Sequence, residues 1–306
     1  PDLKACFIRR FGGPEVLEYG ELPDPAPRTG EVLVEIHAAS VNAADWKMRA
    51  GQYGAAGTFP HVPGRDFSGV IVSSGGFFKP GDAVFGVCEV PREGAYAERL
   101  AIREAIVARK PEQLTHVQMA AIALAGLTAV VSLEETLQLK RGETVLIQGG
   151  AGGVAGFAIA LAKHLGARVI TTASAQNHDY VRQLGADEVI DYRAQDFTKV
   201  VKDADAVFDT VGGDVTTRSF AVLKSGGRLA TVAAGGSAPA SPRPDVKSLR
   251  PKVDRDRRRL DRVAQLVTQG AVRLPEIVEY PLAKAAEAHR VSEARHLRGK
   301  LVLRVR

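Results

Sequence analysis

Residues 144–155 read Thr-Val-Leu-Ile-Gln-Gly-Gly-Ala-Gly-Gly-Val-Ala, the most informative segment of the sequence. Its first half, Val145 to Ile147, is a continuous apolar run, which is typical of a buried parallel strand. Residues 156–165 then place apolar side chains at helical spacing, and 168–172 read as a second strand. The stretch therefore predicts a strand, a glycine turn, a helix and a second strand.

The glycine turn fits the pattern GxGxxA at Gly150, Gly152 and Ala155. The first glycine permits a tight turn, the second lets the backbone approach a pyrophosphate, and the small third residue allows close helix–sheet packing. Phosphate then binds free N–H groups at the start of the helix. A bare glycine pattern also occurs in ordinary turns, but the flanking strand and helix favour a dinucleotide site. We predict that it is formed by Gly150, Ala151, Gly152, Gly153 and Val154.

Length and composition restrict the remaining possibilities. A chain of 306 residues exceeds what one hydrophobic core usually supports, so two domains are expected. The two cysteines, Cys6 and Cys88, are too few for a disulfide framework or a four-thiolate zinc site. No run approaches about 18 apolar residues, and no apolar segment follows the first charges. We therefore expect a soluble, cytoplasmic protein without a membrane partner.

The net charge of +6 could suit a polyanion, although anionic cofactors explain it equally well. The densest basic run, Arg255 to Arg262, coincides with a helical apolar stripe that follows a candidate N-cap, Asp254. We expect its arginines to form the solvated face of that helix. Nucleic-acid binding is the less favoured interpretation.

Periodicity divides the chain into two parts. Up to about residue 120, short strands such as 31–37, 69–73 and 83–87 are separated by Pro-Gly turns, which favours an irregular β-barrel. Strands and helices alternate from 144 to 232, the doubly wound α/β pattern. A strand near Ile277, a helix and a final strand, 301–305, are expected to return to the barrel. The predicted domains are 1–122, completed by 271–306, and 123–270.

Several separated motifs now resemble one family. They include Gly12-Gly-Pro-Glu-Val-Leu17, Val41-Asn-Ala-Ala-Asp45, Pro63-Gly-Arg-Asp-Phe-Ser-Gly69, Gly94-Ala-Tyr-Ala-Glu98 and Gly299-Lys300. In their order and coverage of nearly the whole chain they resemble the zinc-independent medium-chain dehydrogenase/reductases, in particular the quinone oxidoreductases related to zeta-crystallin. The resemblance implies a GroES-like β-barrel joined to a Rossmann domain, with the active site in the cleft between them and a homodimer formed through the Rossmann sheet edge.

The expected metal content follows from residues that are missing. Zinc-dependent members of the superfamily resemble this chain but carry an early catalytic cysteine and a Gly-His-Glu motif, where this sequence reads Gly64-Arg65-Asp66. Catalytic zinc needs about three protein ligands. His37, His61 and Asp66 could be imagined as a set, but their spacing matches no ligand motif. We therefore expect no metal.

The choice of cofactor depends on the end of the second strand. An acidic residue there normally holds the ribose 2′-OH of NAD, but residues 171–178 contain no carboxylate. This favours NADPH, with weaker use of NADH possible. The resemblance implies that Ser174, Asn177, Tyr192 and Arg193 contact the 2′-phosphate and adenine, although relatives often carry lysine at Asn177. Tyr192 could instead be a surface aromatic. Val211 is expected at the ribose, with Ala233 and Ala234 flanking the nicotinamide.

The expected reaction is hydride transfer to a quinone or an α,β-unsaturated carbonyl. By resemblance, Asn42 lies beside the nicotinamide ribose and Thr128 near the nicotinamide ring; a turn-capping amide is the alternative for Asn42. Tyr53 is the candidate donor to the substrate because its phenol stays protonated at neutral pH, or it simply lines the cleft. Two other functions stay open: an enoyl-thioester reductase, and a non-catalytic NADPH-binding protein with a structural or RNA-binding role.

Overall fold

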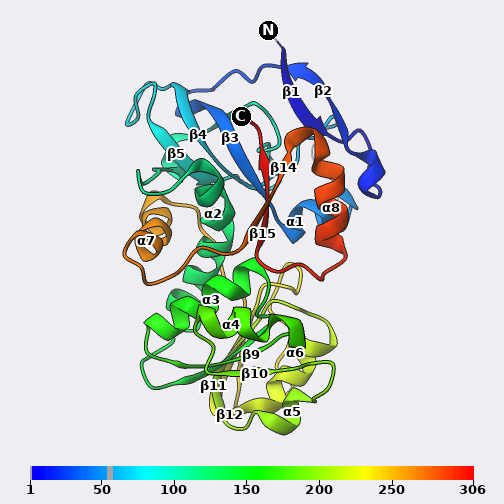
Figure 1. The fold of residues 1–306 in the computed structure, drawn as a ribbon, viewed down its shortest axis with the longest axis vertical. Helices are drawn as coiled ribbons and strands as arrows, with labels where there is room; N and C mark the ends of the chain where they lie inside the picture. Colours follow the sequence, from blue (N-terminus) through cyan, green and yellow to red (C-terminus); the bar gives the residue numbers. More distant parts are fainter. Residues whose placement is uncertain (1, 54–57) are drawn as a thin grey trace. The chain divides into compact units, whose positions relative to one another are not determined.

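The computed structural model describes residues 2–53 and 58–306, which form two compact units (Figure 1). Unit 1 contains Pro1–Leu124, Arg255–Thr268 and Glu276–Arg306, and unit 2 contains Ala125–Asp254 and Gln269–Pro275. Residues 255–268 thus belong to unit 1, whereas the sequence placed them with the Rossmann domain. The cause is a pair of arginines: Arg255 Nε donates to the Cys88 carbonyl at 2.9 Å, and Arg257 Nε to the Val107 carbonyl at 3.0 Å.

Those contacts also correct the expectation for the basic run. Helix α7 begins at Arg257 and ends at Thr268, and the backbone N–H of Arg259 donates to Asp256 Oδ1, so Asp256 rather than Asp254 caps it. The guanidinium of Arg257 lies 4.1 Å from the centre of the Phe77 ring. Arg255 and Arg257 therefore anchor the helix to unit 1 instead of forming a solvated face.

Unit 1 is built on a seven-stranded, mainly antiparallel sheet. Its strand order is β14-β15-β3-β4-β5-β7, and β6 also pairs with β3. A separate ribbon joins β1 to β2. The bounds are β1 Asp2–Phe7, β2 Glu18–Pro23, β3 Glu31–Val41, β4 Asp66–Ser73, β5 Ala83–Val87, β6 Arg99–Arg103, β7 Val107–Arg109, β14 Ile277–Pro281 and β15 Lys300–Arg304. Inward-facing side chains such as Val34, Ile36, Phe67 and Tyr96 form the core.

The end of the chain completes this sheet. Strand β15 runs antiparallel to β3, with Leu301 opposite Val41 and Leu303 opposite Ala39. Lys300 therefore comes to lie at the end of β3, next to the start of helix α1, Ala43–Arg49. Helix α8, Ala285–Glu293, buries Ala285, Ala288 and His289. Residues from opposite ends of the sequence thus share one small region of unit 1.

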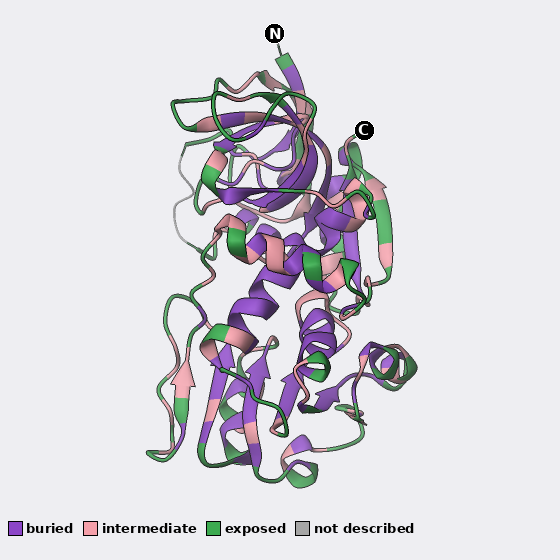
Figure 2. Cartoon of the chain, turned by 90° about the vertical axis from the view of Figure 1, so that its left-hand side faces the viewer, coloured by how far each residue is buried: buried purple, intermediate pink, exposed green. Residues whose placement is uncertain are grey.

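Unit 2 is a parallel six-stranded sheet with the strand order β10-β9-β8-β11-β12-β13. Numbered along the unit, this is the Rossmann order 3-2-1-4-5-6. The bounds are β8 Thr144–Gln148, β9 Arg168–Thr172, β10 Glu188–Ile190, β11 Ala204–Asp209, β12 Leu223–Thr231 and β13 Lys247–Leu249, with helices α3 Gly153–His164, α4 His178–Leu184, α5 Phe197–Val200 and α6 Asp214–Ser219. The central strands β8, β9 and β11 are buried over nearly their whole length (Figure 2).

One helix is unusually long and apolar. Helix α2, His116–Val130, continues as a π-helical segment, Val131–Thr136. Over these 21 residues it is long and apolar enough to cross a membrane, yet 78% of its most apolar 18-residue stretch is buried inside the protein. A core helix meets the same criteria, and burial is how this one satisfies its apolar side chains.

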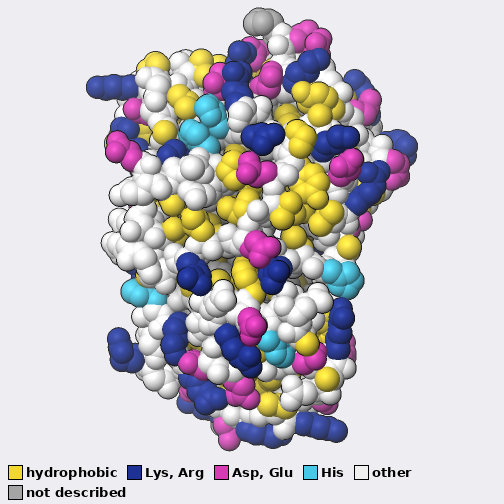
Figure 3. All heavy atoms as spheres, viewed as in Figure 1, with side chains coloured by type: hydrophobic (Ala, Val, Ile, Leu, Met, Phe, Trp, Pro, Cys, Tyr) yellow, Lys and Arg dark blue, Asp and Glu magenta, His cyan; other side chains and the backbone are white. Residues whose placement is uncertain are grey.

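The basic residues are mixed with acidic ones on the face drawn in Figure 3, where Lys and Arg alternate with Asp and Glu. Many are paired, for example Arg168 with Glu188 at 2.7 Å and Arg228 with Glu143 at 2.7 Å. On this face the excess positive charge does not gather into a single patch.

Candidate active site

The predicted dinucleotide turn lies in unit 2, between the end of β8 and the start of α3. Gly149 has a φ of +78°, which glycine tolerates, and its N–H donates to Thr172 Oγ1 at 3.0 Å. The next N–H, that of Gly150, donates to the Thr172 carbonyl at 2.9 Å. The turn is therefore fastened to the end of the neighbouring strand β9. The N–H groups of the first turn of α3 have no acceptor within the helix, so they point out of its N-terminal end.

Two glycines of the turn serve different purposes. A Cβ on Gly150 would lie 2.3 Å from Thr171 Oγ1, so this glycine is required by the fold itself. A Cβ on Gly152 would meet only the Gly149 carbonyl oxygen, at 3.5 Å, and Gly152 has ordinary φ and ψ values of −72° and 164°. The space beside the Gly152 backbone is thus open, although the protein's own packing would allow a side chain there. This is the arrangement that lets a pyrophosphate approach closely.

The loop after β11 lies against this turn. Thr210 Oγ1 donates to the Gln148 carbonyl at 2.7 Å, and a Cβ on Gly149 would lie 3.0 Å from a methyl group of Val211. The two loops follow adjacent strands, β8 and β11, at which the strand order reverses. In open α/β sheets, ligands bind outside the carboxyl ends of the strands at this switch point.

A buried carboxylate shapes the β11 loop. Asp209 accepts hydrogen bonds from the N–H groups of Val211 at 2.9 Å and Gly212 at 3.2 Å, and from the hydroxyl of Thr231 at 3.1 Å. Thr231 Oγ1 in turn accepts from the Ala233 N–H at 3.1 Å. Val211 and Ala233 therefore share one polar anchor. Ala234 follows Ala233, and its carbonyl accepts from Arg250 at 3.4 Å.

The residues predicted to contact a 2′-phosphate lie after β9 and β10, which are neighbouring strands. Ser174 is the N-cap of a short 3₁₀ helix, Ala175–Asn177. Asn177 is itself buried and donates through Nδ2 to Ser174 Oγ at 3.2 Å, while the nearby His178 contacts the Ala173 carbonyl at 3.1 Å. On the other strand, Tyr192 is half-exposed and Arg193 lies 5.8 Å from its ring centre. No acidic side chain precedes Asp179 after β9.

Thr128 is buried within helix α2 and belongs to unit 2. The same unit contains the glycines of the dinucleotide turn, Val211, Ala233 and Ala234. It also contains the pairs Ser174–Asn177 and Tyr192–Arg193. Asn42 and Tyr53 belong to unit 1.

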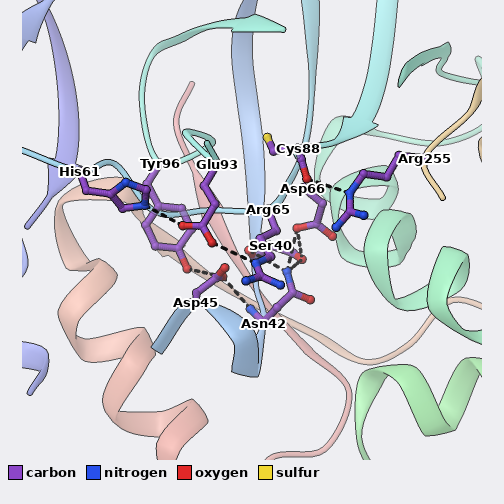
Figure 4. Close-up of polar contacts among 10 residues, drawn as sticks. All are labelled: Ser40, Asn42, Asp45, His61, Arg65, Asp66, Cys88, Glu93, Tyr96 and Arg255. Atoms are coloured by element: carbon purple, nitrogen blue, oxygen red, sulfur yellow. Dashed lines mark hydrogen bonds and ion pairs between the residues drawn. The ribbon is translucent and has the colours of Figure 1, made fainter. Parts of the chain in front are cut away.

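Asn42 is the N-cap residue of α1, but its side chain does more than cap a turn. Nδ2 donates to Asp66 Oδ1 at 3.0 Å (Figure 4). Oδ1 accepts from Lys300 Nζ at 2.8 Å. Asp66 also accepts from Ser40 Oγ at 2.7 Å and from the Leu124 N–H at 2.9 Å. These contacts fix which edge of the amide donates and which accepts. Burial raises the pKa of Asp66 and lowers that of Lys300, and each charge partly offsets the shift of the other.

A second buried network holds the start of α1. Asp45 Oδ2 accepts from the Asn42 N–H at 2.9 Å and from the Tyr96 hydroxyl at 2.8 Å. The same hydroxyl lies 3.0 Å from His289 Nε2, and His289 Nδ1 lies 2.8 Å from Arg49. Because the Asp45 carboxyl is fully buried, desolvation raises its pKa to about 7. Burial and the Arg49 charge lower the pKa of His289 to about 3.

Tyr53, half-exposed, is the other predicted residue of unit 1, and it is associated with an arginine that the sequence analysis did not select. The Arg65 guanidinium carbon lies 5.4 Å from the centre of the Tyr53 ring. Arg65 Nε donates to Glu93 Oε1 at 3.0 Å, and the other oxygen of this carboxylate lies 2.8 Å from His61 Nε2. Glu93 is buried and therefore needs these partners.

The three side chains considered as zinc ligands have separate partners. His61 contacts Glu93 at 2.8 Å, Asp66 contacts Ser40 and Asn42, and the His37 ring lies 4.4 Å from the His116 ring. Among residues 2–53 and 58–306, no group of three or more His, Cys, Asp or Glu side chains could hold a metal ion. The described donor set thus fits no three-ligand site.

Sequence reasoning missed the polar groups that surround Asn42 and Tyr53. Lys300, Asp66, Glu93 and Tyr96 come from distant segments, and only the pairing of β15 with β3 brings Lys300 to Asn42. One signal was available: Lys300 opens an apolar strand, Leu-Val-Leu, at which a buried lysine needs a polar partner.

Comparison with known proteins agrees with this architecture. Residues 28–112 match the alcohol dehydrogenase GroES-like domain, and residues 184–303 match the family model described as zinc-binding dehydrogenase. An NADPH-dependent alkenal/one oxidoreductase of the chloroplast from Arabidopsis thaliana is 30% identical over 99% of this chain and 79% of its own length. A quinone oxidoreductase from Sus scrofa is 30% identical over 98% of this chain and 97% of its own.

Among solved structures, the quinone oxidoreductase from Coxiella burnetii superposes with a TM-score of 0.93 at 34% identity, covering 100% of both chains. The predicted fold class, a GroES-like barrel with a Rossmann sheet, is confirmed by these matches and by the strand order of unit 2. The chain belongs to the quinone oxidoreductase family of the medium-chain dehydrogenase/reductases.

Proposed function

We propose that this protein is an NADPH-dependent oxidoreductase that reduces quinones or α,β-unsaturated carbonyls. The observation that carries the proposal is the dinucleotide turn at the switch point of the parallel sheet, bare over Gly152 and fastened to β9. The names of the relatives support the rest, because one is an NADPH-dependent alkenal/one oxidoreductase and another a quinone oxidoreductase.

The cofactor-binding residues in this proposal all lie in unit 2. The pyrophosphate binds the backbone of Gly150, Ala151, Gly152, Gly153 and Val154, at the positive end of α3. Val211 contacts the ribose, and Ala233 and Ala234 with Thr128 border the nicotinamide. When bound, NADPH supplies the hydride, and the protein positions and polarises the acceptor.

Preference for NADPH rests on Ser174 and Arg193. The Ser174 hydroxyl and the Arg193 guanidinium can bind a 2′-phosphate, and no carboxylate lies between the end of β9 and Asp179 to repel it. The side-chain amide of Asn177 donates a hydrogen bond to Ser174 Oγ, so its role in this proposal is to orient that hydroxyl. Tyr192 provides a ring for adenine to stack on.

The acceptor is handled by residues of unit 1. Tyr53 donates a hydrogen bond to the acceptor's oxygen, and Asn42, held by Asp66 and Lys300, presents a fixed amide to the nicotinamide ribose. We further propose that no metal takes part, since His61 and Asp66 already satisfy other buried groups. A homodimer and a cytoplasmic location are proposed from the family resemblance.

One assay tests the proposal. Oxidation of NADPH and of NADH is followed across a panel of quinones, enones, alkenals and enoyl thioesters, with and without a chelator. We expect NADPH oxidation with quinones or enones that the chelator does not change. Preference for enoyl thioesters would identify the alternative reductase, and NADPH binding without turnover on any acceptor would favour the non-catalytic alternative. Chelator-sensitive activity restored by zinc would refute the metal-free reaction.

A further inference from the structure

The guanidinium of Arg65 has donors that the fold does not use. Its Nε pairs with the buried Glu93, but within residues 2–53 and 58–306 neither terminal nitrogen, Nη1 nor Nη2, has a hydrogen-bond partner. The side chain is 13% exposed, so these nitrogens reach solvent from an otherwise enclosed position. The N–H groups of a largely buried arginine normally donate to acceptors in the protein, since an unpaired buried donor lowers the stability of the fold. Four N–H bonds of Arg65 are therefore available to a ligand.

The fold holds this side chain in a defined place. Gly64, directly before it, has a φ of +105°, and a Cβ there would lie 2.9 Å from the Tyr96 backbone nitrogen. On its other side, the Arg65 carbonyl accepts from the Cys88 N–H at 2.6 Å. Glu93 Oε1 accepts from Nε and fixes the near end of the guanidinium, and the guanidinium carbon lies over the Tyr53 ring, 5.4 Å from its centre. The charge is thus preorganised before any ligand arrives.

Its surroundings match the proposed acceptor-binding region. Arg65 precedes Asp66, whose carboxylate accepts from Asn42 Nδ2 at 3.0 Å. Figure 4 shows the guanidinium lying between the Glu93 carboxylate and the Asn42 side chain. The Arg65 charge also acts on Asp45 at the start of α1, where it lowers the pKa that burial raises. Arg65 therefore has the Tyr53 ring and the Asn42 side chain, the two predicted residues of unit 1, as neighbours.

We propose that Arg65 is a catalytic residue that binds the acceptor's carbonyl oxygen through Nη1 and Nη2. This inference rests on the proposed reductase function. The acceptor's β-carbon gains the hydride from NADPH, which is oxidised to NADP⁺. The C=C electron pair shifts to join the α-carbon and the carbonyl carbon, and the carbonyl π pair moves onto oxygen as an enolate. Arg65 stabilises that negative charge, and solvent then protonates the α-carbon.

Arginine suits this task because its guanidinium stays charged and offers parallel N–H donors to one planar group. It cannot itself deliver the proton, since it does not deprotonate in proteins. For a quinone the same donors stabilise the phenolate-like oxygen formed by hydride transfer, which is then protonated. The substrate class that fits is a flat, conjugated carbonyl compound whose oxygen becomes anionic.

The test compares Arg65→Gln, Arg65→Lys and Arg65→Ala with the wild type on one enone. Loss of a preorganised donor to a developing oxyanion typically costs about 10²-fold in kcat. We expect a kcat lower by about 10² for Arg65→Gln, a partial loss for Arg65→Lys, an unchanged Kd for NADPH and recovery of Arg65→Ala activity by added methylguanidinium. The matched control is Arg103→Gln, since Arg103 also pairs with a glutamate in unit 1, Glu89, and should keep full activity.

A binding experiment separates this inference from the proposed function, because it needs no turnover. The planar anion 4-nitrophenolate mimics the charged oxygen of the enolate or phenolate that hydride transfer forms. We expect it to bind the wild type at least tenfold more tightly than Arg65→Gln, and Arg103→Gln to bind it like the wild type. Equal binding to wild type and Arg65→Gln, or unchanged kcat in Arg65→Gln, would overturn the role of Arg65. A wild type that binds the anion through Arg65 but reduces no acceptor would refute the proposed function, and with it the catalytic role, while the anion site itself would stand.

Discussion

Lys300 Nζ donates to Asn42 Oδ1 across 2.8 Å, although 258 positions separate the two residues in the chain. Both are buried, and the closing strand β15 delivers the lysine to the end of β3. Asp66 holds the opposite edge of the same amide. The orientation of Asn42 thus depends on the first and last parts of the chain together.

Replacing Lys300 by methionine should therefore affect stability and turnover. Breaking a buried charged network by removing one partner costs about 3 kcal/mol or more, because Asp66 keeps a desolvated charge. We expect a lower free energy of unfolding in urea and a lower kcat/KM for enone reduction. Lys202→Met, at an exposed lysine of unit 2, is the control and should leave both unchanged. A Lys300→Met protein with wild-type stability would contradict the network.

Substitutions at Gly150 and Gly152, two glycines of the dinucleotide turn, should affect different properties. The first should lower stability, and the second should lower the affinity for NADPH. Gly150→Ala places a methyl group 2.3 Å from Thr171 Oγ1, so we expect a loss of about 1–3 kcal/mol in the free energy of unfolding. Gly152→Val adds atoms where the protein leaves space, so stability should hold while the Kd for NADPH rises at least tenfold. Urea unfolding and NADPH fluorescence titration measure the two effects. Loss of stability in Gly152→Val, with unchanged affinity, would show that this glycine serves the fold instead.

The sequence predicted the parts of the fold that depend on local patterns. The run 144–155 was sufficient to place β8, the glycine turn and α3, because strand burial, turn geometry and helix periodicity are all written within one segment. Strand β13 and helix α5 were missed, since three or four residues carry no clear periodicity.

The candidate site was predictable only in part, for a different physical reason. Asn42 and Tyr53 were identified through motifs. The roles of Lys300, Glu93 and Arg65 depend on hydrogen bonds to residues 28 to 258 positions away, which the sequence does not show. The basic run on α7 shows the same limit. A sequence shows that Arg255 and Arg257 are charged. It does not show that they donate hydrogen bonds to the backbone carbonyls of Cys88 and Val107.

Cofactor preference should shift with Ser174. Aspartate at this N-cap position is compatible with the fold and places a carboxylate where the 2′-phosphate of NADPH is proposed to bind. We expect Ser174→Asp to lower the ratio of kcat/KM for NADPH over NADH by about 10², equivalent to about 2.7 kcal/mol. Arg193→Gln should weaken NADPH by about tenfold and leave NADH unchanged. If both variants keep the wild-type ratio, the 2′-phosphate binds elsewhere.

The buried Asp45 should give stability a distinct pH dependence. Its pKa is about 7 in the folded protein, against an ordinary 3.8. Between these values the unfolded chain has lost the proton that the folded protein still holds, so this group lowers stability as pH rises from about 4 to about 7. The full effect is on the order of 4 kcal/mol.

The comparison with Asp45→Asn isolates this term. His289 has a folded pKa of about 3 and acts in the opposite direction, but it is present in both proteins and cancels in the difference. The wild type should lose stability relative to Asp45→Asn as pH rises, as measured by urea unfolding at several pH values. A difference that stays constant with pH would mean that Asp45 ionises normally in the fold.

The most direct measurement is the position of the transferred hydride. NADPH with both C4 hydrogens replaced by deuterium is incubated with the wild-type enzyme, a simple enone and a chelator, and the product is examined by NMR. We expect one deuterium on the β-carbon, an unlabelled proton on the α-carbon and a rate that the chelator leaves unchanged. Deuterium on the carbonyl carbon, or no transfer unless zinc is added, would contradict the proposed reaction.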